Sequence, residues 1–269
     1  MNPAPDRAPQ DAQDILYEQH DGIGVVTFNR PKQRNALTFD MYDRLAEICR
    51  ALAAEPAVNA LVIIGAGGRA FAAGTDISSF RDIASPADAL AYERRINEVL
   101  DAVERCPVPT IAALAGACTG GGAAIAAACD LRVATRDLKF GFPIARTLGN
   151  CLSIASLSRL VALIGAGRTR DILFTARLIG AEEAQAIGLV SDIVEDFETV
   201  HALALDLART LAGHAPLTLR ATKEAMRRLR LASAEADDRD LITLCYMSED
   251  FCEGQAAFLE KRPPVWKGR

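Results

Sequence analysis

Three short segments made almost entirely of apolar residues constrain the fold of this 269-residue chain more than any other feature. They are IGVVTF at 23–28, ALVIIGAG at 60–67 and TIAALAG at 110–116. Short apolar runs rich in β-branched residues favour strands, and no run is long enough to cross a membrane. The second segment has no polar side chain on either face, which is typical of a strand covered on both sides. We therefore expect buried strands at these three places.

Helices alternate with these strands. A helix capped by Thr38 or Asp40 has apolar residues at helical spacing, and a more polar helix spans about 86–105. A short buried helix begins at the glycines 120–122, and DLRVAT at 130–135 predicts a fourth strand. Alternating strands and helices predict an α/β core.

The second half of the chain has a mainly helical pattern. The helical segments that we predict are SIASLSRLVALIG, GRTRDILFTA, AEEAQAIG, 198–212, 217–231 and 235–260. We expect a disordered tail over 1–13, an α/β core over 14–200 and a smaller helical region over 201–269. That region would pack on the core or on a neighbouring subunit.

Composition excludes several classes of function. The formal net charge of −5 gives no indication of nucleic-acid binding. The seven cysteines are irregularly spaced without a CxxC pair, and the three histidines are scattered, so neither a disulfide framework nor a metal site is predicted. The N-terminal residues lack the apolar stretch of a signal peptide. These features favour a protein of the cytoplasm with reduced thiols and no membrane partner.

Two glycine-containing loops follow neighbouring predicted strands. FAAGTDI at 71–77 places Gly74 and Thr75 in a turn, and TGGGAAI at 119–125 places three glycines at a helix start. Loops after adjacent strands of an α/β core lie at one edge of the sheet, so each loop can direct a backbone N–H into a shared space. Two such donors would hold an oxyanion. The alternative is that these glycines only form tight turns. A third loop, GAGGRA at 65–70, lacks the last glycine of a dinucleotide-binding motif.

Several separated motifs, in order, resemble the crotonase superfamily, also called the enoyl-CoA hydratase/isomerase family. They are NRPKQRNALT (29–38), FAAGTDI (71–77), PTIAALAGACTGGG (109–122), CDLRVAT (129–135), KFGFP (139–143), LFTARLIGAEEAQAIGLV (173–190) and EGQAAFLEKRPP (253–264). The resemblance covers about residues 14–265. It implies a spiral of ββα turns with a helical C-terminal trimerisation region, in a homotrimer or a dimer of trimers.

The same resemblance implies an enzyme whose substrate is an acyl-coenzyme A thioester and which needs no further cofactor. The backbone N–H groups of Thr75 and Gly121 would form an oxyanion hole for the thioester enolate. Coenzyme A would lie along the 29–38 loop. The residues implied to contact it are Lys32, Arg34, Ala36, Ala73, Phe258 and Lys261. For the basic residues, the alternative is a solvated surface charge. Asp76 and Asp130 match family positions, and we interpret both as structural carboxylates that cap backbone N–H groups.

The chain departs from the family pattern where hydratases of the family carry two catalytic glutamates. Those positions are Ala124 and Ile144, and neither side chain can transfer a proton. General acid–base catalysis contributes about 10²–10⁴ in rate, so hydration by the two-glutamate route is in doubt. The following segment, IARTLGNCLS at 144–153, is expected to form the pocket wall.

That wall supplies Arg146, Thr147, Asn150, Cys151 and Ser153, of which Arg146, Asn150 and Cys151 are candidate site residues. Arg146 would suit a substrate with a second carboxylate, or would point to solvent. Cys151 would be a nucleophile only if its thiol pKa were lowered, and no histidine is placed to lower it. Glu93, on the helix over 86–105 with Tyr92 and Asn97, is the only nearby acid, and we interpret it as part of a solvated helix face.

Three functions follow as hypotheses. The first is an enoyl-CoA hydratase or isomerase that acts through a stabilised enolate. The second is an atypical decarboxylase, isomerase or hydrolase that relies on the oxyanion hole with Arg146, Asn150 or water, and loss of CO₂ generates an enolate without a base. The third is a catalytically silent acyl-CoA-binding subunit.

Overall fold

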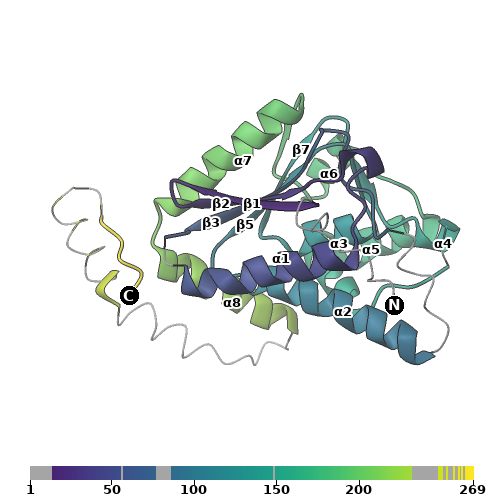
Figure 1. Cartoon of the computed structure of the whole chain (residues 1–269), viewed down its shortest axis with the longest axis horizontal. Coiled ribbons are helices and arrows are strands. Elements are labelled where there is room, and N and C mark those ends of the chain that lie inside the picture. Colours follow the sequence, from purple (N-terminus) through teal and green to yellow (C-terminus); the bar gives the residue numbers. More distant parts are fainter. Residues whose placement is uncertain are drawn as a thin grey trace, which may run out of the picture.

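The computed structural model describes most of the chain. The described residues are 14–55, 57–76, 86–147, 149–231, 248–250, 253, 257, 260, 262 and 264–269. Within them, strands and helices alternate through the first half and helices dominate the second (Figure 1). The predicted helix over 235–260 lies outside the described ranges, apart from isolated positions.

A six-stranded sheet forms the centre of the fold. In spatial order its strands are β1 (Ile15–His20), β2 (Ile23–Phe28), β3 (Ala60–Gly65), β5 (Thr110–Leu114), β7 (Leu131–Thr135) and β9 (Asp192–Val194). The strands β2, β3, β5 and β7 confirm the four predicted segments. All neighbours are parallel except β1 and β2, which form an antiparallel hairpin. Its turn residues, Asp21 and Gly22, both have positive φ, as a two-residue hairpin turn requires.

A second, three-stranded parallel sheet contains β4 (Ala70–Ala72), β6 (Ala117–Thr119) and β8 (Lys139–Gly141). Each turn of the chain places one strand in each sheet and then forms a helix. The helices that close the three turns are α2 (Pro86–Glu104), α3 (Gly121–Ala128) and α4 (Ile144–Thr147). This is the ββα spiral that the family resemblance implies.

Helical layers cover both faces of the six-stranded sheet. Along β3, Val62 and Ile64 pack in a cluster with α7 (Phe197–Ala212), whereas Leu61 and Ile63 pack in the main core. In Figure 1, α7 lies on one side of the sheet and α1 (Phe39–Ala51), which continues as a 3₁₀ turn over Leu52–Ala54, lies on the other with α2. Every residue of β3 is buried, as its unbroken apolar sequence predicts.

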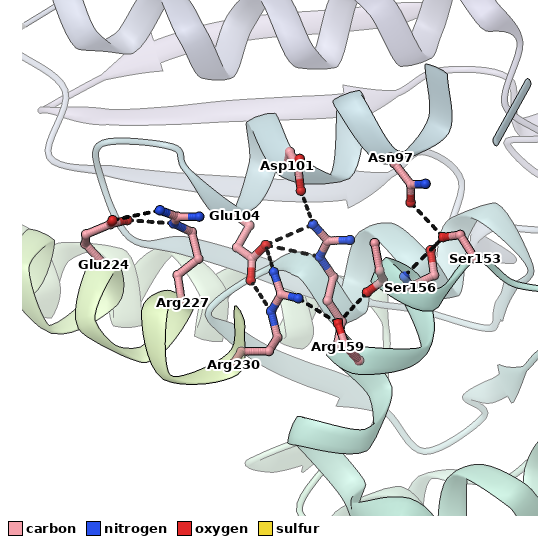
Figure 2. Close-up of polar contacts among 11 residues, drawn as sticks. Asn97, Asp101, Glu104, Ser153, Ser156, Arg159, Glu224, Arg227 and Arg230 are labelled. Carbon is pink, nitrogen blue, oxygen red and sulfur yellow. Dashed lines mark hydrogen bonds and ion pairs between the residues drawn. The ribbon is translucent and has the colours of Figure 1, made fainter. Parts of the chain in front are cut away.

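The second half contains α5 (Ile154–Thr175), α6 (Ala181–Ala186), α7 and α8 (Pro216–Leu231), in agreement with the predicted helical segments. Gly165 has a positive φ of 76° within α5 and divides it into two helical stretches. Salt bridges join α2, α5 and α8, because Glu104 accepts hydrogen bonds from both Arg159 and Arg230 (Figure 2). None of the helices in the described part of the chain is long and apolar enough to cross a bilayer.

Candidate active site

The two predicted glycine loops meet at the end of the smaller sheet. A Cβ atom added to Gly120 would lie 3.5 Å from the Cα atom of Gly74. Leu37 holds the first loop from the other side, since its N–H donates to Gly74 O at 2.8 Å and its carbonyl accepts from Asp76 N at 2.8 Å. Neighbouring N–H groups of an extended segment point in opposite directions. The Thr75 N–H therefore points away from Leu37.

Gly121 is the first residue of α3, where a backbone N–H has no partner within the helix. Among the described residues, neither this N–H nor that of Thr75 donates a hydrogen bond to the protein. A Cβ at Gly121 would lie 1.9 Å from Tyr42 Oη and 3.0 Å from Thr75 Oγ1, so a side chain does not fit here. Gly74 and Gly120 have positive φ values of 108° and 53°. These two glycines form turns, whereas Gly121 is required for clearance.

Both loops line a cavity of about 270 Å³. Its described lining residues are Tyr42, Ala73, Gly74, Thr75, Tyr92, Glu93, Ile96, Thr119, Gly120, Gly121, Ala124, Pro143, Ile144, Thr147, Asn150, Cys151, Leu152 and Ser156. The structure thus brings together the sequence-predicted residues Ala73, Thr75, Gly121, Asn150 and Cys151. Ala124 and Ile144, at the positions of the family glutamates, line the same cavity.

Arg146 does not line this cavity, which corrects its predicted place in the pocket wall. It is exposed on α4, a helix of four residues. Successive residues of a helix are rotated by about 100°, so Ile144 and Thr147, three residues apart, both face the cavity while Arg146 does not. A guanidinium that recognises a second substrate carboxylate is therefore not part of the described pocket.

A chain of hydroxyl groups extends along one wall. Tyr42 Oη and Thr75 Oγ1 share a hydrogen bond of 2.8 Å, and Thr75 Oγ1 and Tyr92 Oη share one of 3.3 Å. Burial raises the pKa of Tyr42 well above its usual value, so the phenol stays protonated at neutral pH. Tyr42 was not among the predicted site residues, although a tyrosine on the buried face of an amphipathic helix needs a partner for its hydroxyl.

Glu93 is half-buried and lines the cavity, so its interpretation as part of a solvated helix face is wrong. Burial raises the pKa of its carboxyl above the usual range, and the nearby Ser153 backbone N–H opposes this shift only in part. One helical turn further along α2, Asn97 Oδ1 accepts a 2.8 Å hydrogen bond from Ser153 Oγ (Figure 2). Ser153 also caps α5, where its side chain accepts from the Ser156 N–H. Asn97 of α2 thus holds Ser153 at the start of α5.

The 29–38 loop, which includes a 3₁₀ turn over Pro31–Gln33, is anchored next to the cavity. The buried Asn35 Nδ2 donates to Ala66 O and Ala70 O at 3.0 and 2.7 Å, and Arg34 O accepts from Ala73 N at 3.0 Å. The anchoring leaves the side chains of Lys32 and Arg34 exposed.

Ala36 keeps both backbone groups within the protein. Its N–H donates to Gln33 O at 3.1 Å, and its carbonyl accepts from Arg30 Nη1 at 2.6 Å. Phe258 and Lys261, the remaining predicted coenzyme A contacts, lie outside the described residues. The Ala73–Arg34 hydrogen bond joins this loop to the cavity lining, which includes Ala73, whereas Lys32 and Arg34 are not among the described lining residues.

Both aspartates at family positions make structural contacts. Asp130 Oδ2 accepts from the Thr110 N–H at 2.7 Å and from Lys223 Nζ at 2.6 Å, which confirms its interpretation as a cap. Asp76 accepts from Arg30 Nη1 at 3.0 Å and thereby connects the two loops.

The sequence model of the enoyl-CoA hydratase/isomerase family matches residues 18–269. The chain belongs to this family. The short-chain-enoyl-CoA hydratase of Clostridium acetobutylicum is 32% identical over 251 residues, which cover 92% of this chain and 95% of that protein. The 2,3-dehydroadipyl-CoA hydratase of Escherichia coli is 33% identical over a stretch that covers 95% of this chain and 99% of that protein.

Solved structures give the same result. A crystal structure of an enoyl-CoA hydratase/carnithine racemase from Magnetospirillum magneticum has a TM-score of 0.87 at 34% identity, covering 95% of this chain and 96% of that one. The crotonase-type fold is therefore confirmed. The protein is therefore an acyl-CoA enzyme of this family.

Proposed function

We propose that this chain transforms an acyl-CoA thioester through an enolate whose oxygen is held by the backbone N–H groups of Thr75 and Gly121. One observation carries the proposal: both N–H groups lack a partner among the described residues, and both belong to loops in contact at one cavity. Gly121 also begins a helix, whose positive end favours a developing negative charge. Preorganised donors of this kind stabilise a transition state by several kcal/mol.

The proposed binding mode places coenzyme A along the 29–38 loop. Lys32 and Arg34 are exposed cations without a described ion-pair partner, so their charges are available to phosphate groups. Ala73 lines the cavity and connects this loop to the oxyanion donors. The thioester would then lie between the loop and the acyl cavity.

Hydration by two glutamates is not part of the proposal, because Ala124 and Ile144 line the cavity without an ionisable group. Relatives at 32–33% identity are named hydratases of CoA thioesters, and the proposed function shares with them the thioester only. Turnover of a panel of acyl-CoA thioesters, with analysis of the products, would identify the acyl group and the net reaction.

Two matched variants test the oxyanion hole. In a Tyr42→Phe background, which removes the oxygen that a Cβ at position 121 would strike, we compare Gly121→Ala with Gly121→Pro. Both variants add a Cβ, but only proline removes the N–H, and proline is well tolerated at the first position of a helix. We expect Gly121→Pro to lower kcat by a further factor of about 10²–10³.

Equal turnover by the two variants would contradict the enolate mechanism. Tight acyl-CoA binding by the unmodified chain, without turnover of any thioester in the panel, would instead support the silent binding subunit.

A further inference from the structure

The proposed enolate needs a group that moves a proton, and the positions of the family glutamates do not supply one. The described residues lining the cavity include four with titratable side chains, namely Tyr42, Tyr92, Glu93 and Cys151. Burial raises the pKa of both tyrosines above its usual value, so neither is a base near neutral pH. Glu93 is the only carboxylate among these lining residues.

The position of Glu93 is fixed by its surroundings. It lies on α2, which packs against α3, the helix that begins with Gly121. The Ser153 backbone N–H lies next to its carboxylate, and the Asn97–Ser153 and Ser153–Ser156 hydrogen bonds hold Ser153 in place. These contacts place the Glu93 carboxylate at the wall of the cavity.

Glu93 has no ionic partner in the described part of the chain. Among the described residues, the lining includes no lysine, arginine or histidine, and no salt bridge includes Glu93. Half-buried carboxylates without a cation are costly, and structural ones are usually paired. The half-buried Glu93 carboxylate lowers the free energy of unfolding and lies in the same cavity as the unpaired oxyanion donors. A catalytic role explains its presence there better than a structural role does.

We propose that Glu93 is the catalytic acid–base residue of this site, on a different helix from the positions where the family hydratases carry theirs. The inference rests on the proposed function, because it assigns the proton transfer of the same enolate. The carboxylate removes the proton from the carbon next to the thioester carbonyl. The C–H electron pair forms the enolate double bond, and the carbonyl π electrons move to the oxygen held by Thr75 and Gly121. Return of the proton reverses each change.

Hydrogen exchange isolates this step from the net reaction. Full-length protein is incubated in D₂O with saturated acyl-CoA thioesters from acetyl-CoA to octanoyl-CoA, which have no double bond to hydrate, and deuterium at the α carbon is followed by mass spectrometry. We expect the unmodified chain to catalyse exchange, and Glu93→Gln to lower the rate about 10²-fold or more. Glu98→Gln, an isosteric change on the exposed side of the same helix, is expected to keep the full rate.

Two further measurements separate catalysis from folding and binding. The Kd for the thioester is expected to be similar in Glu93→Gln and the unmodified protein, since the substitution retains size and polarity. In Glu93→Ala, added formate is expected to restore exchange, because a small carboxylate can occupy the vacated space. A structural role for Glu93 would not produce this rescue.

The outcomes distinguish the two proposals. Exchange by Glu93→Gln at the rate of the unmodified protein would overturn the role of Glu93 and leave the oxyanion hole intact. Loss of exchange in Glu93→Ala without rescue by formate would also overturn it. Equal exchange by the Gly121→Pro and Gly121→Ala variants would overturn the proposed function instead, and absence of exchange in the unmodified protein would overturn both.

Discussion

At the scale of single residues, Glu93 is expected to lower stability while it supports activity. Burial raises its carboxyl pKa in the folded state, so the folded protein retains a proton that the unfolded chain has lost. The free energy of unfolding therefore falls as pH rises from the ordinary glutamate pKa to the raised one, and stays lower above it. Glutamine does not ionise, so Glu93→Gln is predicted to be more stable than the unmodified protein above that window.

Urea unfolding at a series of pH values from acidic to neutral measures this difference. Glu98→Gln is the control, because its side chain is exposed and its charge remains solvated. A difference between Glu93→Gln and the unmodified protein that stays constant across the series would contradict the prediction.

The site residues differ in how far the sequence predicted them. Thr75 and Gly121 lie within glycine loops whose spacing and family resemblance are visible in the sequence, and the structure brings both to the cavity. Tyr42 and Glu93 come from helices, where nothing local separates a side chain facing a cavity from one facing the core or the solvent. Arg146 was misplaced because a helix of four residues turns its successive side chains through large angles.

At the scale of elements, one carboxylate connects three helices that are far apart in the sequence. Glu104 of α2 accepts from Arg159 of α5 at 2.9 Å and from Arg230 of α8 at 2.7 Å. The two arginine side chains are only 2% and 8% exposed. Removing the charge of one partner in a buried ion pair leaves an uncompensated charge. We predict that Glu104→Gln lowers the free energy of unfolding by about 3–5 kcal/mol.

Denaturant unfolding checks the value, and Glu47→Gln provides the comparison. Glu47 also pairs with an arginine, Arg44, but both side chains are more than half exposed, at 61% and 54%. Exposed pairs contribute about 0–1 kcal/mol, so this substitution should change little. Similar losses in the free energy of unfolding for the two substitutions would show that burying Glu104 with Arg159 and Arg230 does not strengthen their interaction.

Strand length explains which elements the sequence predicts. The four buried strands β2, β3, β5 and β7 contain five or six apolar-rich residues and were predicted. The strands of the second sheet contain three residues each, which is too short for any periodicity to appear. Their pairing depends on the spiral as a whole, so no strand was predicted there. The glycine that divides α5 was visible, and it separates the two segments predicted at that place.

At the scale of the whole molecule, the outer surface of the C-terminal helices carries exposed apolar side chains. On α8, Met226 and Leu229, three residues apart and so on one side of the helix, are 64% and 59% exposed in the single chain. Large exposed apolar patches mark surfaces that another protein covers. The family resemblance implies a trimerisation region over these helices, and α8 lies within it. We therefore propose that this face of α8 is covered in a homotrimer or a dimer of trimers.

Light scattering coupled to size exclusion tests this assembly on the full-length protein, whose single-chain mass is 28.8 kDa. We expect a mass close to three or six times that value. Leu229→Glu places a charge on the apolar face and is predicted to lower the mass toward that of one chain, since burying an unpaired carboxylate is costly. Leu90→Glu, at a leucine of α2 that is 66% exposed, is the matched control and should leave the mass unchanged. A single-chain mass for the unmodified protein at micromolar concentration would contradict the trimer, and an unchanged mass for Leu229→Glu would place the interface elsewhere.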